Sequence, residues 1–398
     1  MPEVATKRSN AGWTTVAFGD VVRQVKDKVD PEESGLERYV AGEHMDTDDL
    51  RIQRWGEIGD GYLGPAFHMR FKPGHVLYGS RRTYLRKIAV AHFEGITANT
   101  TYVLKSADPE VLLPGLLPFL MQTRSFTEHS VRESRGSVNP YVNFSDLAWF
   151  EFQLPPLEDQ RELVAAFQAA EVVLSSTDSV ADAARKAQAA AFDSLIAQQE
   201  PVETPLGDIL EASPRNGCSA LASNEATGYW VLALSAISKW GYRGDQFKPV
   251  VPTQEMKAAK IQMGDLVVSR SNTRELVGLP AVFPEDRDDV SYPDTMMRLA
   301  IDTTKASTTF IELCLRSKQC RRQVQSFAAG TSASMKKING TNLKRVTVPL
   351  CDRADQDLIV QTLSPFSAQI DDCSKRHRMA SELKQLMLAR GLGCGGAE

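Results

Sequence analysis

Two short segments hold the side chains whose chemistry is easiest to name. They contain Arg81, Arg82, Tyr84, Arg86 and Lys87 in the first segment, and Arg270, Asn272 and Arg274 in the second. Arginine can donate two hydrogen bonds to guanine, asparagine can pair with adenine in the major groove, and any cation can neutralise phosphate. A solvated charged loop is the plain alternative for either segment. The two segments lie at matched positions of an internal repeat described below, which favours a nucleic-acid contact.

A second pair of segments has glycine beside small hydroxyl residues. Gly136-Ser137 has Arg132 and Arg135 nearby, and Gly330-Thr331 has Lys336 and Lys337 nearby. Backbone N–H groups next to glycine can approach a phosphate closely. These segments are therefore candidate phosphate contacts, with an ordinary turn as the alternative. Ser137 is included among the candidate DNA-binding residues.

Motifs for catalysis are weak in comparison. The sequence has no GxxxxGK[ST], no GxSxG, and no GxGxxG after a predicted strand. His92-Phe93-Glu94 fits one half of a zinc-deaminase signature, but the PCxxC half is missing. Asn139-Pro140-Tyr141 is better explained as a loop than as a methyltransferase motif. Cys314 and Cys320 are expected in the core. We therefore expect no catalytic residue and no metal site.

Composition restricts the class of protein further. The 398 residues include 46 Lys and Arg against 50 Asp and Glu, a net charge of −4, so a uniformly basic protein is excluded. The segments from Arg70 to Arg135 and from Met256 to Arg345 are locally basic. No run approaches the roughly 20 apolar residues of a membrane span, and 6 cysteines without a CxxC pair do not form a disulfide framework. We expect a reduced, cytoplasmic protein.

The chain repeats itself at about half its length. At a shift of 196 residues, the stretch 143–174 aligns with 339–370, and Gln160 meets Gln356. Weaker matches upstream have shifts of 188 to 194, which small loop insertions explain. Each copy carries one basic segment and one Gly-Ser or Gly-Thr segment, so the candidate contacts occupy matched places. The sequence predicts a tandem duplication.

A long helix is predicted at the end of each copy. Apolar residues fall at 163, 167, 170 and 174, and at 359, 363, 366, 370 and 373 with Leu383 and Leu386 later. Alanines 181, 184, 187 and 191 extend the first helix. Pro365 predicts a kink or a late start in the second. We expect the helices to pair antiparallel, with packing of each helix on its own domain as the alternative.

The remaining parts are predicted to be mixed α and β. Strands are expected at 75–78, 149–154, 266–268 and 345–350, and helices at 111–127 and 309–327. Residues 198–205 are expected to form a linker, and 391–398 a disordered tail. The fold class is therefore α+β: two similar α/β domains, 1–154 and 201–350, separated by long antiparallel helices within 155–200 and 351–398, with an internal pseudo-twofold repeat.

The sequence resembles the DNA-specificity (S) subunit of type I restriction–modification enzymes. The resemblance depends on Leu154-Pro155-Pro156-Leu157-Glu158-Asp159-Gln160 at a strand-to-helix junction, on the Gly-Ser loop before it, and on their repetition from Val348-Pro349-Leu350 to Gln356. The second copy departs from the pattern, since Cys351 and Asp352 replace Pro-Leu. The resemblance covers nearly the whole chain, and its specificity lies in the architecture.

The resemblance implies a non-catalytic protein with two target-recognition domains that each contact one half of a bipartite double-stranded DNA site. It implies assembly with two copies of a methylation subunit that uses S-adenosylmethionine to methylate adenine. A restriction subunit that uses ATP and Mg²⁺ can join, and this chain itself holds no cofactor and contacts no membrane. The alternatives are a specificity subunit of another methylation-based defence system, a scaffold that does not bind DNA, and a self-contained methyltransferase.

Overall fold

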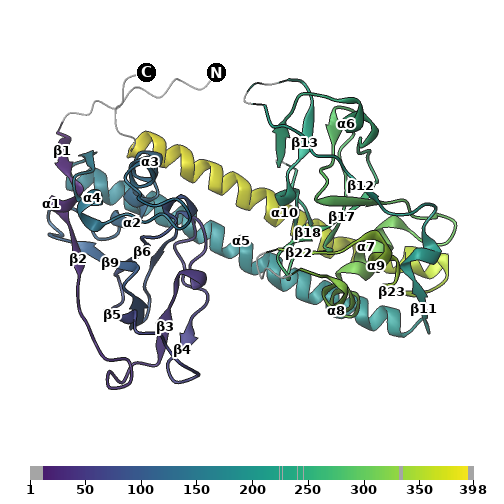
Figure 1. The fold of residues 1–398 in the computed structure, drawn as a ribbon, viewed down its shortest axis with the longest axis horizontal. Helices are drawn as coiled ribbons and strands as arrows, with labels where there is room; N and C mark the ends of the chain where they lie inside the picture. Colours follow the sequence, from purple (N-terminus) through teal and green to yellow (C-terminus); the bar gives the residue numbers. More distant parts are fainter. Residues whose placement is uncertain are drawn as a thin grey trace. The chain divides into compact units, whose positions relative to one another are not determined.

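The computed structural model describes residues 12–392 except 224, 226, 240, 245 and 331–334 (Figure 1). The chain forms two compact units. Unit 1 comprises the residues up to Leu174 together with those from Met379 on, and unit 2 comprises Ser175–Arg378. Most of the expected tail, from residue 393, lies outside the described residues. Each long helix contributes one end to each unit.

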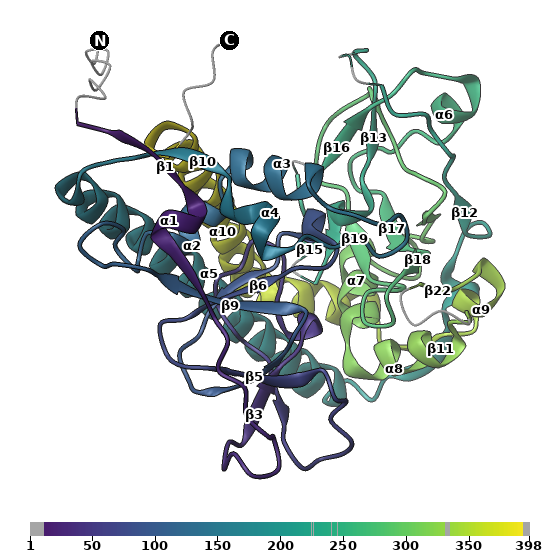
Figure 2. The same cartoon turned by 60° about the vertical axis from the view of Figure 1, so that its left-hand side comes forward.

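Unit 1 contains two four-stranded sheets and one strand pair, ordered β2-β9-β6-β7, β4-β3-β8-β5 and β1-β10. Strands β9 and β6 can be followed in Figure 2. The strands are β1 (Thr14–Ala17), β2 (Val22–Val25), β3 (Arg38–Val40), β4 (Gly56–Glu57), β5 (Phe67–Phe71), β6 (Val76–Gly79), β7 (Ile88–Val90), β8 (Gly95–Ala98), β9 (Thr101–Ser106) and β10 (Glu151–Leu154).

Unit 1 also contains short helices, several of which share one core cluster with the first sheet. They are α1 (Phe18–Val21), η1 (Gly42–His44), η2 (Thr83–Leu85), α2 (Leu117–Met121), α3 (Arg124–Arg132) and α4 (Phe144–Ala148). The single helix expected over 111–127 is wrong. Thr123 has extended backbone angles and its hydroxyl accepts the Phe126 N–H, so it ends one helix and caps the next.

The first sheet of unit 2 repeats the strand order of the first sheet of unit 1, whereas its second sheet has three strands instead of four. Its sheets are β12-β21-β17-β19 and β16-β13-β20, with the strand pairs β11-β23, β14-β15 and β18-β22. The strands are β11 (Val202–Pro205), β12 (Arg215–Asn216), β13 (Trp230–Leu232), β14 (Ile237–Ser238), β15 (Gly241–Tyr242), β16 (Phe247–Pro249), β17 (Leu266–Ser269), β18 (Ser271–Asn272), β19 (Pro280–Val282), β20 (Val290–Ser291), β21 (Met296–Leu299), β22 (Lys336–Lys337) and β23 (Thr347–Leu350). The expected linker 198–205 is wrong in its second half, because β11 pairs with β23.

The helices of unit 2 also differ from expectation at one point. They are η3 (Leu206–Ile209), η4 (Leu234–Ala236), α6 (Gln254–Ala258), α7 (Thr308–Arg316), α8 (Lys318–Phe327) and α9 (Gly340–Lys344). The single helix expected over 309–327 is interrupted at Ser317, whose extended backbone ends α7 and whose hydroxyl accepts the Cys320 N–H. The break matches the one at Thr123 in unit 1.

The repeat is visible in strand pairing. In each unit, a central strand pairs antiparallel on both sides, β6 between β9 and β7, and β17 between β21 and β19. Each unit also has a pair of parallel strands, β3 with β8 and β13 with β20. Each ends on the same kind of antiparallel pair, β1-β10 and β11-β23. The expected fold class, two similar α/β domains with long antiparallel helices, is confirmed.

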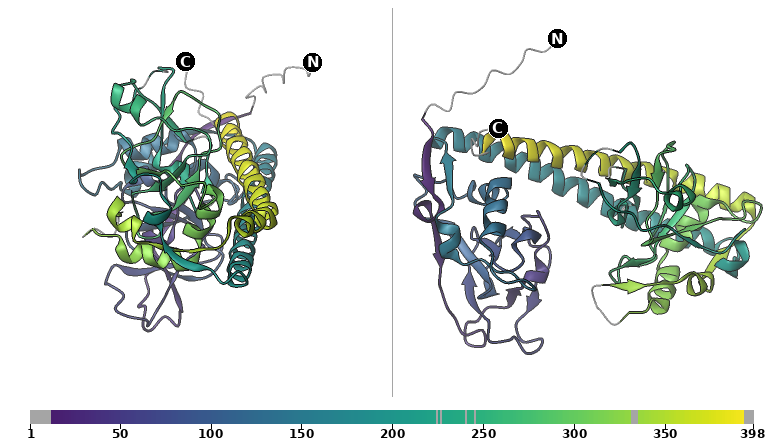
Figure 3. Two further views of the ribbon diagram at one scale, coloured as in Figure 1. Left: turned by 90° about the vertical axis from the view of Figure 1, so that its right-hand side faces the viewer. Right: turned by 45° about the horizontal axis from the view of Figure 1, so that its top comes forward.

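Two long helices run through these units, α5 (Leu157–Ala197) and α10 (Arg353–Gly391) (Figure 3). In unit 1, Leu163 of α5 lies beside Gly391, and Glu171 pairs with Lys384. In unit 2, Asp178 pairs with His377, and Gln188 with Ser367. Residue numbers rise along α5 as they fall along α10 in both units, so the pairing is antiparallel.

Of the kink or late start expected from Pro365, the late start does not occur, because α10 begins at Arg353. The apolar pattern expected near the end of this helix is wrong. Leu383 and Leu386 are exposed (56% and 55%), while Lys384 and Leu388 are buried. Leu388 and Leu392 pack in one cluster with Phe18, Phe119 and Phe167 of unit 1. The C-terminal end of the chain therefore completes the core of the N-terminal unit.

Each long helix is fastened to its domain by the glutamine at the aligned position. Gln160 accepts the Leu113 N–H and donates to the carbonyls of Val111 and Pro155 at 2.8–2.9 Å. Gln356 accepts the Ser307 N–H and donates to the carbonyls of Lys305 and Cys351 at 2.8–3.0 Å. Both side chains are buried, so the strand-to-helix junctions have the same construction despite Cys351.

Among the described residues, no helix has the length and apolar character needed to cross a membrane.

Candidate nucleic-acid interface

In unit 1 the two predicted basic segments lie against each other. Arg81 forms a bridge with Tyr141, and Tyr141 forms another with Arg135. The Arg82 N–H donates to the Pro140 carbonyl at 2.6 Å. We call residues 81–87 with 132–141 the first loop pair. The Asn139-Pro140-Tyr141 sequence is part of this loop structure.

In unit 2 the equivalent segments are joined in the same way. Ser271 pairs with Lys337 and Asn272 with Lys336, as strands β18 and β22. The Ile338 N–H also donates to the Arg270 carbonyl at 3.0 Å. We call residues 270–274 with 335–338 the second loop pair. Segments about 55 to 65 residues apart in the sequence thus meet at the same place in both copies.

The first loop has an unusual backbone. Arg82 and Arg86 flank η2 and both adopt the left-handed conformation, with φ of 49° and 47°. This conformation is unfavourable for residues other than glycine and persists only where surrounding contacts impose it. The contacts include buried Thr83, whose hydroxyl lies 2.9 Å from Ser134 Oγ. The loop is therefore a defined support for its side chains.

Two arginines of the first loop face solvent without an ion partner. Arg81 and Arg82 are exposed, and neither side chain forms an ion pair among the described residues. Tyr84 next to them is 54% exposed. These three side chains are the parts of the first loop that are most available to a ligand.

The other cations of this loop have partners within the protein. Arg86 forms an ion pair with Asp48. The Lys87 ammonium donates to the Gly42 carbonyl, and burial lowers its pKa. Arg86 and Lys87 therefore contribute more to the shape of the loop than to its free positive charge.

In the other segment of the first loop pair, residues 132–141, the positive charges of the arginines are partly neutralised. Arg132 lies 3.0 Å from Glu133, and Arg135 lies 3.1 Å from Asp146. Both arginines remain exposed, as is Ser137. Phosphate binding by Arg132 or Arg135 would compete with these surface ion pairs, which are individually weak.

In the second loop pair, too, some polar side chains are bound within the protein and others are exposed. Arg270 donates to the Asp294 carbonyl at 3.1 Å, and Lys336 to the Gly330 carbonyl at 2.6 Å. Asn272 donates to Ser269 Oγ and accepts the Thr273 N–H. Arg274 and Lys337 are exposed and form no ion pair within the described part of the chain. Thr331 lies outside the described residues.

The residues that support the backbones of these loops could not be identified from the sequence. Thr47 donates to the Leu85 carbonyl at 2.8 Å, and the Asp48 N–H donates to the Arg86 carbonyl at 3.3 Å. In unit 2, Arg321 of α8 donates to the Glu275 carbonyl at 2.9 Å, and burial lowers the pKa of this guanidinium to about 10. None of these residues belongs to a motif, since each acts through contacts distant in sequence.

Cys314 and Cys320 lie in the core of unit 2, as expected. Burial raises the pKa of the Cys314 thiol well above its ordinary value and that of Cys320 to about 11. No group of three or more His, Cys, Asp or Glu side chains within the described residues has the arrangement of a metal site.

Comparison with known proteins gives a consistent answer. No family model matches the chain. It is 23% identical over 206 residues to the specificity subunit of the type I restriction enzyme EcoEI of Escherichia coli, a match covering 49% of this chain and 34% of that protein. It is also 23% identical over 192 residues to the putative MjaX specificity subunit of Methanocaldococcus jannaschii, covering 46% and 44%. The chain thus matches less than half the length of these relatives.

A solved structure has a similar fold over almost the entire chain. The type I restriction–modification S subunit from M. genitalium aligns over 97% of this chain and 98% of its own, with a TM-score of 0.53 and 13% identity. The resemblance to specificity subunits of type I restriction systems, first inferred from the sequence, is confirmed.

Proposed function

We propose that this chain is the DNA-recognition subunit of a type I restriction–modification complex and has no catalytic activity of its own. The observation that carries the proposal is that the first and second loop pairs are both basic and lie at equivalent places in the two units, whose sequences differ. The similarity to specificity subunits supports the same role.

Each loop pair would contact one half of a bipartite site. Exposed cations such as Arg82 and Lys337 would neutralise phosphates and position the protein without distinguishing sequences. Base discrimination would come from side chains with two hydrogen-bonding groups, Arg81 and Arg274 to guanine and Asn272 to adenine. Because the exposed side chains of the two loop pairs differ, the half-sites would differ in sequence.

Chemistry on the DNA would be carried out by partner subunits. Two copies of a methylation subunit would bind S-adenosylmethionine and methylate adenine in each half-site. A restriction subunit using ATP and Mg²⁺ would join for cleavage. The present chain would contribute the site selection, so it would need none of these cofactors to bind DNA.

Two measurements test this function. Binding of the full chain to duplex DNA should weaken steeply as salt rises, because phosphate contacts release counterions. Sequencing of modified bases in cells that express the chain with its methylation subunit should give one split motif with an adenine in each half. Binding that is insensitive to salt, or a continuous motif, would contradict the proposal, and the former would favour a scaffold.

A further inference from the structure

A buried lysine lies between the two long helices in unit 1. The Lys384 side chain is 4% exposed, and its Nζ lies 2.5 Å from Oε1 of Glu171, which is 20% exposed. Nζ is also 5.7 Å from the ring centre of Phe119 in α2. Removing an ammonium group from water is costly even when it is paired. The position therefore calls for a reason beyond helix packing.

The repeat supplies a comparison for this pair. The shift of 196 that aligns Gln160 with Gln356 places Glu171 on Ser367 and Lys384 on Gln188. In unit 2 those two residues also meet, with Gln188 Nε2 donating to Ser367 Oγ at 2.8 Å. A neutral pair thus makes the equivalent contact between the same helices. Antiparallel pairing at this level does not require charge.

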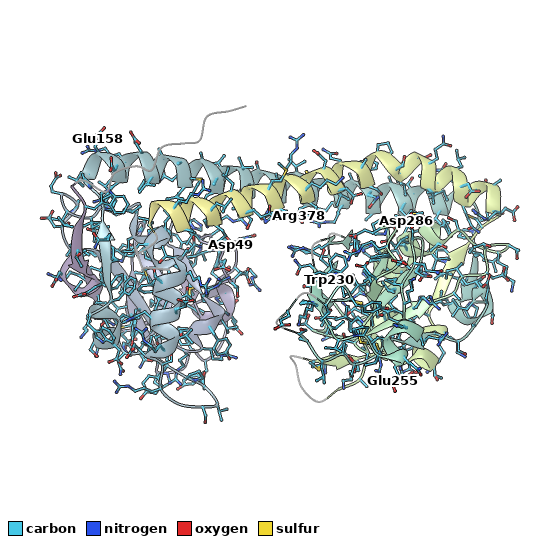
Figure 4. All side chains as sticks on the ribbon, turned by 90° about the horizontal axis from the view of Figure 1, so that it is seen from above. Asp49, Glu158, Trp230, Glu255, Asp286 and Arg378 are labelled. Atoms are coloured by element: carbon cyan, nitrogen blue, oxygen red, sulfur yellow. The ribbon has the colours of Figure 1, made fainter. Side chains whose placement is uncertain are left out.

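In unit 1, a continuous series of contacts also connects the Glu171–Lys384 pair to the first loop, and we call this series the route. Helix α2, which presents Phe119 to Lys384, ends at Met121. The next residue, Gln122, caps it, and Gln122 Nε2 donates to the Asp48 carbonyl at 3.1 Å. The carboxylate of Asp48 pairs with the Arg86 guanidinium, and the backbone N–H of Asp48 donates to the Arg86 carbonyl. Figure 4 labels Asp49, the next residue in the chain. The route connects α10 to the left-handed residue that ends η2.

Electrostatics support this connection. Burial raises the pKa of the Asp48 carboxyl, while the positive charges of Arg86 and Lys384 act in the opposite direction. Lys384 therefore helps to keep Asp48 ionised, which is the form that holds Arg86. Both Asp48 and Arg86 have positive φ, at 58° and 47°, so the ion pair restrains two unfavourable backbone conformations.

Unit 2 supports its loop by other means. Arg321 of α8 donates to the Glu275 carbonyl, and that contact involves no residue of the long helices. The charged pair is thus found in the unit whose loop is held by a carboxylate. The neutral pair is found in the unit whose loop residues, as far as the structure describes them, form no ion pair with a carboxylate.

We propose that Lys384 is a positioning residue for DNA recognition: from the C-terminal helix, and together with Glu171, it holds Asp48 and Arg86 so that the first loop presents Arg81, Arg82 and Tyr84 in one arrangement. This inference rests on the proposed function. It assigns to the first half-site a residue that follows the entire second domain in the sequence.

The test gives unit 1 the neutral pair of unit 2. The full-length E171S/K384Q variant should keep a wild-type melting temperature, because the same pair stabilises the helices in unit 2. In selection from a duplex library randomised in both half-sites, its discrimination at the first half-site should fall by about tenfold, the loss of one good base contact. Discrimination at the second half-site should not change.

Controls separate positioning from general damage. Gln188→Leu disturbs the equivalent helix contact in unit 2 and should leave discrimination at both half-sites unchanged. Lys384→Arg retains the positive charge and should retain discrimination at the first half-site. This variant tests the proposal even if E171S/K384Q fails to fold. In a D48N background, the E171S/K384Q change should cause no further loss, because both act through one route.

The outcomes can be distinguished. If the wild-type chain selects no bipartite site, the proposed function and the positioning role are both wrong. If it selects one, and folded E171S/K384Q selects the same first half-site with undiminished discrimination, only the positioning role is overturned. A loss from Lys384→Arg as large as that from the double variant would overturn it too.

Discussion

Arg81 in the first loop pair and Arg274 in the second are exposed arginines that form no ion pair among the described residues. Other basic side chains near them are held by protein partners, as Arg86 is by Asp48 and Arg270 by a carbonyl. Substitution of the two exposed arginines is therefore expected to affect the ligand more than the fold.

Arg81→Ala should weaken DNA binding and relax the preference at the first half-site alone. The expected loss is about 1–3 kcal/mol of discrimination if the side chain contacts a base. Arg274→Ala should do the same at the second half-site, so each variant is the control for the other. A mutation that changed both half-sites equally, as judged by library selection, would count against separate recognition.

The buried thiols should be unreactive in the folded protein. Burial keeps Cys314 and Cys320 protonated at pH 8, since the pKa of Cys314 lies well above its ordinary value and that of Cys320 at about 11. A thiol reagent followed by peptide mass spectrometry should modify neither residue until denaturant is added. Rapid labelling of either under native conditions would show that the core of unit 2 opens.

At the scale of elements, the stability of each unit depends on the strand-to-helix junction at the start of its long helix. Near the start of α5, the side chain of Gln160 makes three hydrogen bonds to backbone groups of Val111, Leu113 and Pro155. A buried backbone group that loses its partner costs more than the hydrogen bond itself contributes. The same reasoning applies to Gln356 at the start of α10.

Gln160→Met should destabilise unit 1 by about 1–3 kcal/mol for each backbone group left without a partner. Gln356→Met should have a comparable effect on unit 2, and Gln168→Met, on an exposed face of α5, should have little effect. Denaturant unfolding with a probe in each unit measures the difference. Equal stability of Gln160→Met and Gln168→Met would refute the argument.

Pro365 leaves a defect inside α10 that Ser364 partly corrects. Proline has no N–H for the carbonyl of Gln361, and the Ser364 hydroxyl donates to that carbonyl at 2.8 Å. Pro365→Ala should therefore raise the melting temperature of the full chain, and Ser364→Ala should lower it. In the Pro365→Ala background, Ser364→Ala should have little effect, because the backbone N–H then replaces the hydroxyl.

At the scale of the whole molecule, the duplication and the antiparallel helices could be predicted from aligned residues such as Gln160 and Gln356. The breaks at Thr123 and Ser317 could not, because a hydroxyl can cap a helix or lie within one, and the apolar pattern continues through both. Asp48 and Lys384 were missed for a different reason: their partners, Arg86 and Glu171, are distant in sequence. The prediction for Leu383 and Leu386 was wrong because the spacing of apolar residues does not show which face of α10 packs against other elements.

Removal of the residues after Arg378 should destabilise unit 1 and leave unit 2 unchanged. Leu388 and Leu392 are 2% and 3% exposed in the core that contains Phe18 and Phe167. Their loss should cost about 3–6 kcal/mol, at roughly 1.5–3 kcal/mol for each buried side chain. Limited proteolysis should then cleave within 12–174 before it cleaves within 175–378, and the opposite order would be inconsistent with the shared core.

The way α10 completes unit 1 has a consequence for biosynthesis. Residues 12–174 are translated before unit 2, yet Leu388 and Leu392, which close their core, are translated only after it. Unit 2 has all its residues by Arg378. The second domain can therefore finish folding before the first, and the nascent unit 1 exposes an unfilled apolar surface until the end of α10 has been translated.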